Sequence, residues 1–287
     1  MNANLLRVLN KLKVFKYLNF KKEITINNNR FKVPIYNNIG QSYLSAFEPW
    51  MLSLLKTISP FITNSFVDVG VNIGQTLLKV KSISSDIKYI GFEPNPVCYN
   101  YLENLLDLNH FHNAKIFQLG ISNKTENGVL YFTNSSKTDP SASIVNGFRS
   151  DDQISQQINI PLATWDTVRE KEDFEAISIL KIDVEGGELE VLESFKSSLI
   201  SDRPIIIIEI LPTYNKDNTF RIERQKNVEQ LLKTLNYTIF RILKENDELI
   251  GFKALSKIEI HDNINFCDYV MVPKSKLEAF KRLVKIF

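Results

Sequence analysis

The order of apolar and polar residues predicts an α/β chain in which short buried strands alternate with amphipathic helices. Apolar runs rich in β-branched residues predict seven strands, at residues 65–69, 88–93, 114–119, 177–183, 204–210, 237–243 and 268–272. Helical spacing predicts helices at residues 45–58, 76–83, 94–108, 189–196 and 221–234. We therefore expect a mostly parallel seven-stranded sheet with helices on both faces, in which the final strand is antiparallel.

Basic amphipathic segments occupy the two ends of the chain. Residues 4–19 predict a helix with lysine and arginine between its apolar positions, and residues 274–287 predict a second one. Between the first helix and the core, residues 23–36 alternate on both sides of an asparagine-rich turn, which predicts a hairpin. The terminal helices fit docking on an anionic membrane surface, packing on the protein's own domain, or contact with a second subunit.

A glycine turn follows the first predicted core strand. Asp68 lies near the strand end, Gly70 and Gly74 follow, and the helix then begins at Gln75 and Thr76. Because glycine has no Cβ, such a turn lets a ligand lie against the backbone at a helix N-terminus. The spacing differs from the G-x-G-x-x-G turn of dinucleotide sites, and an acid at this point would repel a pyrophosphate.

Acidic residues end four of the predicted strands, at Asp68, Glu93, Asp183 and Glu209. The carboxyl ends of parallel strands meet at one edge of the sheet, where α/β folds bind ligands. Glu93 stands 23 residues after Gly70, the distance at which an acid commonly binds ribose hydroxyls. These acids therefore predict a ligand site at one sheet edge, although Glu93 by itself could also be a solvated strand end.

A long polar segment, residues 124–155, follows the third strand and its turn at residues 120–123. It has few periodic apolar residues, and long irregular segments in compact domains are often functional loops. We expect a lid on the substrate side of the site, with a short hairpin through residues 129–132 as an alternative.

Three motifs in this order resemble the FkbM-type S-adenosylmethionine-dependent methyltransferases. The motifs are Val67-Asp68-Val69-Gly70-Val71-Asn72-Ile73-Gly74, Gly91-Phe92-Glu93-Pro94-Asn95 and Leu180-Lys181-Ile182-Asp183-Val184-Glu185-Gly186-Gly187-Glu188. The resemblance runs from about Glu48 to the last strand. Val71 and Gly187 stand where alanine is common in the family, and neither change removes a polar group.

The resemblance implies a class I methyltransferase fold and S-adenosylmethionine as the cofactor. It implies that Asp68, Gly70, Asn72 and Gly74 line the methionine part, that Glu93 holds the ribose, and that Ile121 and Ser122 flank the adenine. Gln75, Thr76, Pro94, Asn95 and Asp183 complete the expected cofactor site. On this basis we divide the chain into an N-terminal helix, hairpin and lead-in helix (1–60), a methyltransferase domain (61–273) and a C-terminal helix (274–287).

Composition and charge narrow the function classes. Of 35 bases and 33 acids, the segments 1–22 and 274–287 hold 11 bases and one acid, so the rest has a net charge of −8. An acidic body argues against a nucleic-acid partner. Cys98 and Cys267 have no metal-ligand spacing. No run approaches the roughly 18 apolar residues of a membrane span, and no signal peptide is visible. We expect a cytoplasmic protein, or a peripheral one at the inner face of the membrane.

The expected reaction is O-methylation of a carbohydrate hydroxyl, or of a polyketide or lipid hydroxyl. Methyl transfer from a sulfonium needs positioned reactants and removal of the acceptor proton. Asp183 is the first candidate for the base, followed by Glu185 and Glu209, although Glu185 could instead cap the following helix. The oxygens of these three acids could share a hard divalent cation, but we expect no metal. The motifs contain no histidine, which argues against a transition metal.

Two other classes of protein stay open at this stage. A nicotinamide-dependent dehydrogenase would also use Glu93, but it should carry the G-x-G-x-x-G turn that the chain lacks. A non-catalytic scaffold docked at a membrane by its basic ends would keep the core and lose the cofactor site. The presence of both Asp68 and Glu93 argues against the scaffold.

Overall fold

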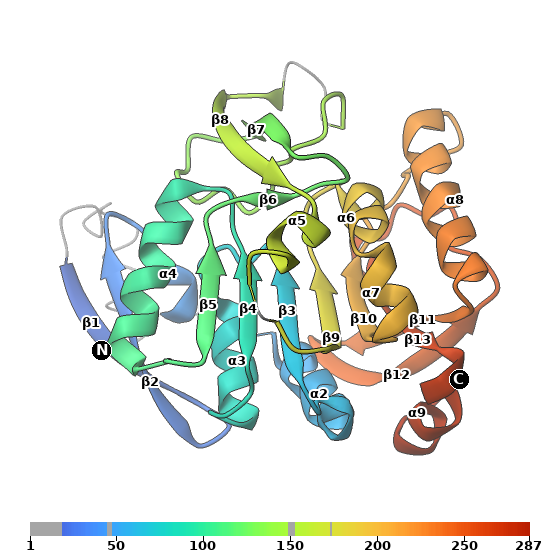
Figure 1. Ribbon diagram of the computed structural model, residues 1–287, viewed down its shortest axis with the longest axis horizontal. Helices are drawn as coiled ribbons and strands as arrows, with labels where there is room; N and C mark the ends of the chain where they lie inside the picture. The colour runs from blue at the N-terminus through green and yellow to red at the C-terminus, as the bar shows by residue number, and fades with distance from the viewer. Residues whose placement is uncertain (1–18, 45–47, 149–152, 173) are drawn as a thin grey trace.

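The computed structural model describes residues 19–44, 48–148, 153–172 and 174–287. Its central element is an eight-stranded sheet with the strand order β12-β11-β13-β10-β9-β3-β4-β5 (Figure 1). The sheet strands are β3 (Ser65–Val69), β4 (Tyr89–Phe92), β5 (Ala114–Phe117), β9 (Ile177–Ile182), β10 (Ile205–Glu209), β11 (Tyr237–Glu245), β12 (Glu248–Leu255) and β13 (Asp268–Pro273). The five strands from β5 to β10 are parallel, and β13 runs antiparallel to both β10 and β11. This is the class I methyltransferase fold.

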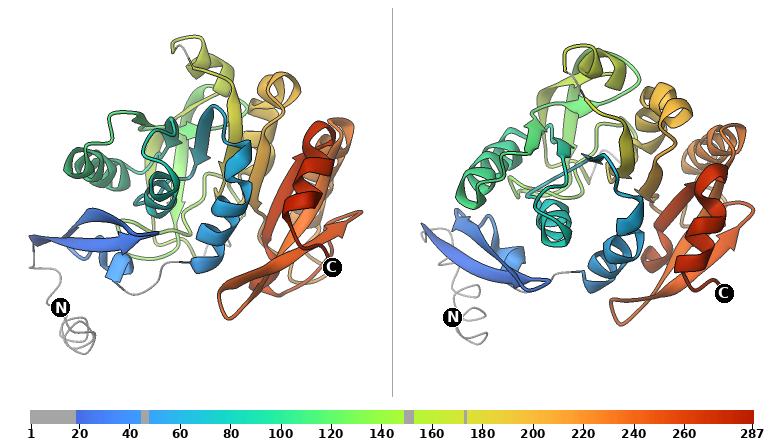
Figure 2. Two further views of the ribbon diagram at one scale, coloured as in Figure 1. Left: turned by 90° about the horizontal axis from the view of Figure 1, so that it is seen from below. Right: turned by 60° about the horizontal axis from the view of Figure 1, so that its bottom comes forward.

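Two apolar layers bury the sheet between helices. The helices are α2 (Pro49–Ile58), α3 (Gln75–Ile83), α4 (Pro96–Asn109), α5 (Trp165–Arg169), α6 (Glu188–Ser194), α7 (Lys196–Ser201), α8 (Thr219–Thr234) and α9 (Leu277–Leu283). Helices α2, α3, α4 and α9 contribute side chains to one apolar cluster, and α5 to α8 contribute to the other. Figure 2 shows helices on both sides of the sheet. In β10, Ile205 and Ile207 join the first cluster while Ile206 and Ile208 join the second, so side chains alternate between the faces as a doubly covered strand requires.

The sheet has one strand more than the seven expected. Strand β12 pairs antiparallel with β11 at the edge of the sheet, and its residues are mostly exposed or half-buried. An edge strand of this kind lacks the continuous apolar run that marks the buried strands, so the sequence pattern did not reveal it. The antiparallel last strand, β13, is confirmed.

The polar segment after β5 contains more strand than we expected. Strand β7 (Glu126–Phe132) pairs antiparallel with β8 (Gln156–Ala163), which also pairs with the short β6 (Gly120–Ile121). Residues 129–132 therefore form part of a strand, as the hairpin alternative requires, but this strand begins at Glu126 and its partner is the distant β8 rather than a neighbouring segment. The irregular part between the strands is correspondingly shorter.

The N-terminal hairpin is confirmed as β1 (Asn19–Ile26) and β2 (Asn29–Tyr36). Asn27 and Asn28 at its tip both have positive φ, 46° and 62°, as a two-residue type I′ turn requires. The hairpin packs on α4, where the Tyr101 hydroxyl donates to the Pro34 carbonyl at 2.8 Å. It is therefore attached to the domain through a buried contact.

The helix expected at residues 45–58 begins at Pro49. Glu48 has a φ of 38° and cannot continue a right-handed helix, and the proline after it favours the first helical position. Residues 45–47 lie outside the described chain. The helix expected at residues 4–19 also falls almost entirely outside the described residues, so its docking role stays a prediction.

The C-terminal helix α9 packs on the protein's own sheet. Phe280 is fully buried, with its ring 5.2 Å from Phe240 and 5.4 Å from Phe252. This supports the packing alternative for the C-terminal segment, and membrane docking by the basic ends stays a prediction. Among the described helices, none combines the length and the apolar character needed to cross a bilayer.

Candidate active site

A cavity of about 510 Å³ lies at the carboxyl ends of the central strands. It is lined by the glycine turn after β3, by the residues after β4 and β9, and by Glu209 of β10. Residues before α2 and residues between β7 and β8 close other sides. Its volume falls in the range of small-molecule and cofactor sites.

The glycine turn after β3 passes directly against the backbone of β9. Gly70 has a φ of 89°, and a Cβ at this position would stand 1.8 Å from the carbonyl oxygen of Asp183. Only glycine can therefore occupy this position without moving the two segments apart. Asn72, Gln75 and Thr76 then line the cavity.

Glu93 is buried at the end of β4 and is held by two backbone amides. Its Oε2 accepts from the Asn72 N–H at 2.7 Å and its Oε1 from the Asn95 N–H at 2.8 Å. Burial raises the pKa of Glu93 to about 7, against the lowering effect of these two bonds. Each carboxylate oxygen has a second lone pair, so the residue could still accept from two hydroxyls of a ligand. Its binding to ribose stays a prediction.

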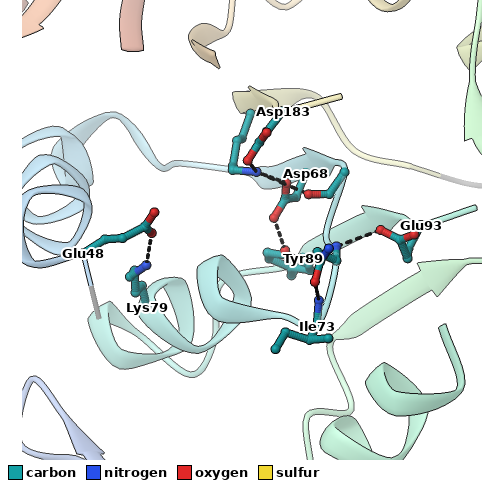
Figure 3. A network of polar contacts seen from close by, with 10 residues as sticks. Glu48, Asp68, Ile73, Lys79, Tyr89, Glu93 and Asp183 are labelled. Atoms are coloured by element: carbon teal, nitrogen blue, oxygen red, sulfur yellow. Dashed lines mark hydrogen bonds and ion pairs between the residues drawn. The ribbon is translucent and has the colours of Figure 1, made fainter. Parts of the chain in front are cut away.

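Asp68 is fully buried and does not line the cavity. Its carboxylate accepts from the Tyr89 hydroxyl and from Lys181 Nζ, the latter at 3.1 Å. Burial lowers the pKa of Lys181, but the charges of Asp68 and Asp183 outweigh that effect and hold it above its usual value. Asp68 thus faces an internal lysine, beside Tyr89 and Asp183 (Figure 3). Its expected contact with the methionine part stays a prediction.

Three further acids meet on the other side of Lys181. Carboxylate oxygens of Asp183, Glu185 and Glu209 lie within 4.8 Å of one another. Asp183 Oδ2 is 3.3 Å from Lys181 Nζ. Burial and the neighbouring charge of Asp183 raise the pKa of Glu209 to about 10. The trio could hold a hard cation, and it could also accept or donate a proton at a reacting hydroxyl.

The structure brings together most of the residues expected in the site. Those that line the cavity are Gly70, Asn72, Gln75, Thr76, Glu93, Pro94, Asn95, Ile121, Asp183, Glu185 and Glu209. Gly74 and Ser122 join Asp68 outside it. Gly74 faces α4, since its Cβ would meet Leu102 and Leu105, and buried Ser122 bonds through its N–H to the Ala163 carbonyl.

Lys181 and Glu48 are two cavity residues that sequence reasoning did not assign. A signal for Lys181 was available, because a lysine inside an otherwise apolar buried strand must have an anionic partner. Glu48 had no comparable signal, since it lies in a connection between two elements. Its place in the cavity wall depends on how the N-terminal segment packs.

Described residues between β7 and β8 contribute to the cavity wall, and the lid role of this segment stays a prediction. Ser136, Thr138 and Asp139 line the cavity from this side. Asp139 is buried and accepts from the N–H groups of Thr133 and Ser141, at 2.7 and 3.0 Å, which shapes the loop from inside. The Asn95 side chain also donates to the Lys137 carbonyl at 2.8 Å, so the loop is tied to the end of β4.

Comparisons with known proteins agree with this architecture. The methyltransferase FkbM domain matches residues 68–239, which is more than half of the chain. Methyltransferase sdnD of Sordaria araneosa is 32% identical over 159 residues, covering 47% of this chain and 60% of that protein. Methyltransferase 1 of Beauveria bassiana is 25% identical over 151 residues with the same coverage. The match thus spans 60% of the length of these relatives.

Solved structures show weaker likeness. The methyltransferase FkbM of Methylobacillus flagellatus has a TM-score of 0.44 and 15% identity, over 73% of this chain and 43% of that one. The Podospora anserina methyltransferase PaMTH1, solved with S-adenosylhomocysteine, has a TM-score of 0.43 and 8% identity, over 95% and 97%. The family assignment depends on the domain match, and the chain belongs to the methyltransferase FkbM domain family.

Proposed function

We propose that the chain is an S-adenosylmethionine-dependent O-methyltransferase that acts on a carbohydrate hydroxyl. The observation that carries this proposal is the charge of the cavity. Among the described residues that line it, Lys181 is the sole base against seven acids: Glu48, Glu93, Asp139, Asp183, Glu185, Glu209 and Asp268. Such a wall suits a cofactor with a sulfonium and an ammonium group and disfavours the pyrophosphate of a dinucleotide.

The residues present fit this cofactor. Gly70 and Asn72 line the cavity, and its volume of about 510 Å³ is within the range of cofactor sites. Glu93 retains lone pairs for the ribose hydroxyls, and Ile121 offers an apolar surface for a base. The cofactor supplies an activated methyl group, so the protein must position the acceptor and remove its proton.

Asp183 is our first candidate for the group that takes the acceptor proton. It follows β9 at the centre of the sheet edge, lines the cavity and is half-exposed, so an acceptor can reach it. Lys181 Nζ donates to Asp183 Oδ2 at 3.3 Å, and the Glu209 side chain also forms a hydrogen bond with the Asp183 carboxylate. Glu185 and Glu209 lie close enough to orient the same hydroxyl.

Isothermal titration calorimetry with S-adenosylhomocysteine tests the cofactor assignment. We expect binding in the micromolar range and no detectable heat with NADH under the same conditions. Binding of NADH in preference to S-adenosylhomocysteine would support a dehydrogenase, and binding of neither would contradict the proposal. Methyl transfer to glycosides, measured with labelled S-adenosylmethionine, then tests the acceptor class.

A further inference from the structure

Glu48 has an unusual backbone and an unusual partner. It precedes α2 with a φ of 38°, a left-handed conformation that is uncommon outside glycine, asparagine and aspartate. It also lies before residue 68, where the family match begins. Residues in strained conformations collect at functional sites. The side chain lines the cavity and is 46% exposed.

The partner of Glu48 is a lysine buried inside the domain. Lys79 on α3 has a fully buried side chain, and its Nζ donates to Glu48 Oε2 at 2.6 Å. Burial lowers the pKa of Lys79, and the charge of Glu48 opposes that shift. A buried ammonium is costly to desolvate, so a surface ion pair would be a less expensive way to stabilise the fold. The arrangement instead fixes one oxygen of a carboxylate that faces the cavity.

The same arrangement recurs on the neighbouring wall. Asp268 of β13 lines the cavity and is paired with Lys244 of β11 at 2.5 Å, and both side chains are largely buried. Lys244 also lies over the ring of Trp50, 4.5 Å from its centroid, and Trp50 lines the cavity two residues after Glu48. The two carboxylates therefore belong to one corner of the cavity, joined through Lys244 and Trp50.

This corner lies away from the expected ribose end. Figure 3 shows Glu48 and Glu93 on opposite sides of Asp68 and Asp183. Asp268 is on β13, two strands beyond β9 in the sheet and on the side away from β4. If Glu93 holds the ribose, the part of the cavity between Asp183 and the Glu48 corner is available to a second reactant.

We propose that Glu48 binds the methyl acceptor, and that together with Asp268 it selects an uncharged polyol by accepting hydrogen bonds from its hydroxyls. This inference rests on the proposed function. Among the described residues, none donates a hydrogen bond to Glu48 Oε1, so that oxygen can accept one from a hydroxyl while Lys79 holds Oε2. A residue outside the region that matches the FkbM domain, residues 68–239, would then help to select the acceptor.

Charge balance argues for an uncharged ligand. Glu48 and Asp268 each have a largely buried lysine at one oxygen, so the charge of each is partly compensated and its other oxygen can accept a hydrogen bond. An anionic acceptor such as a uronate or a sugar phosphate would meet these oxygens without a cationic partner. Lys181, the single base in the described lining, is already shared between Asp68 and Asp183.

The test compares Glu48→Gln with the wild type on matched acceptors. Labelled S-adenosylmethionine is offered with alkyl glycosides of neutral hexoses and of the corresponding uronic acids. We expect neutral glycosides to exceed uronates in kcat/KM by at least about tenfold. Glu48→Gln should raise KM for the neutral acceptors about 10- to 100-fold, the size of a lost charged hydrogen bond, with kcat changed less than about threefold.

Lys79→Met separates positioning from folding. The variant keeps Glu48 but removes its anchor, so KM should rise in the same direction while the melting temperature stays equal or increases, since a buried ammonium has been removed. Glu23→Gln, on the exposed hairpin and 3.6 Å from Arg30, is the matched control and should leave KM unchanged.

Calorimetry with S-adenosylhomocysteine on every variant distinguishes failure of the acceptor inference from failure of the cofactor assignment. Cofactor affinity should be equal in the wild type, Glu48→Gln and Lys79→Met. Three results would overturn the inference and leave the cofactor assignment standing. They are an unchanged KM in Glu48→Gln, preferred methylation of uronates, and no methylation of any neutral glycoside by a protein that binds the cofactor product. If the wild type fails to bind the cofactor product, the proposed function itself is contradicted.

Discussion

Lys181 Nζ lies 3.1 Å from the carboxylate of Asp68, directly across from it on the neighbouring parallel strand. Both residues interrupt apolar strands, and the register of β3 and β9 pairs them on the same face. Lys181 also reaches Asp183, which follows β9 and lines the cavity. One buried ammonium therefore connects the core of the sheet to the candidate base.

Asp68→Asn should act mainly on stability. The substitution leaves Lys181 buried with a weaker partner, so we expect the free energy of unfolding to fall by about 2–4 kcal/mol. Denaturant unfolding measures this change, with exposed Asp217→Asn as the control. If the folded variant instead keeps full stability and loses affinity for S-adenosylhomocysteine, Asp68 contacts the cofactor as the family resemblance implies.

Glu93→Ala should weaken cofactor binding. A carboxylate that accepts from two ribose hydroxyls contributes about 2–4 kcal/mol after desolvation, so the affinity for S-adenosylhomocysteine should fall by a factor of about 30 or more. Part of the loss could come from the freed N–H groups of Asn72 and Asn95, and the melting temperature reports on that part. Glu103→Ala, exposed on α4, is the control. Equal affinity in calorimetry would refute the ribose assignment.

Asp183→Asn should separate chemistry from binding. The change keeps the shape of the side chain and removes its basicity, so turnover should fall by about 10²–10⁴ while cofactor affinity stays within a few fold. Single-turnover kinetics with an active glycoside measure the step. Retained turnover in this variant, together with its loss in Glu185→Gln or Glu209→Gln, would transfer the role to that residue.

Glu188→Gln should stabilise the protein at alkaline pH. Glu188 is buried, and burial raises its pKa from 4.5 to about 7, against its bond from the Gly186 N–H. Between pH 4.5 and pH 7, Glu188 is therefore mostly protonated in the folded state and mostly ionised in the unfolded state. This contribution to stability is complete below pH 4.5 and is lost as the pH rises through 7.

Glutamine cannot ionise, and its oxygen can still accept from Gly186. The gain in unfolding free energy for Glu188→Gln should be near zero at pH 4.5 and reach about 1–3 kcal/mol at pH 8. Urea unfolding at several pH values measures it. A gain that is the same at every pH would show that ionisation of Glu188 is not its cause.

Metal removal should leave activity intact. Asp183, Glu185 and Glu209 are close enough to share a cation, but Lys181 already supplies positive charge to Asp183. We expect turnover after treatment with EDTA to stay within about twofold of the untreated enzyme, and added Mg²⁺ to change it no further. Loss of turnover that Mg²⁺ or Mn²⁺ restores would instead identify the trio as a metal site.

Local features of the sequence predicted much of the fold. The Asn27–Asn28 turn, the continuous isoleucine run of β10 and the glycine at position 70 each have a conformational preference that acts within a few residues. The acids at the strand ends were also visible, because the carboxyl ends of parallel strands must meet at one edge. Asp68, Glu93, Asp183 and Glu209 were therefore predicted together, and all of them except Asp68 line the cavity.

Only the tertiary structure decided which of these acids face the cavity and what holds them. Asp68 turns to Lys181 because the β3–β9 register pairs residues 113 positions apart. Glu48 joins the site because the chain before α2 returns to the sheet edge, and Lys79 anchors it from a helix 31 residues later. Local preferences do not specify strand register or long-range packing, which depend on burying the whole core at once.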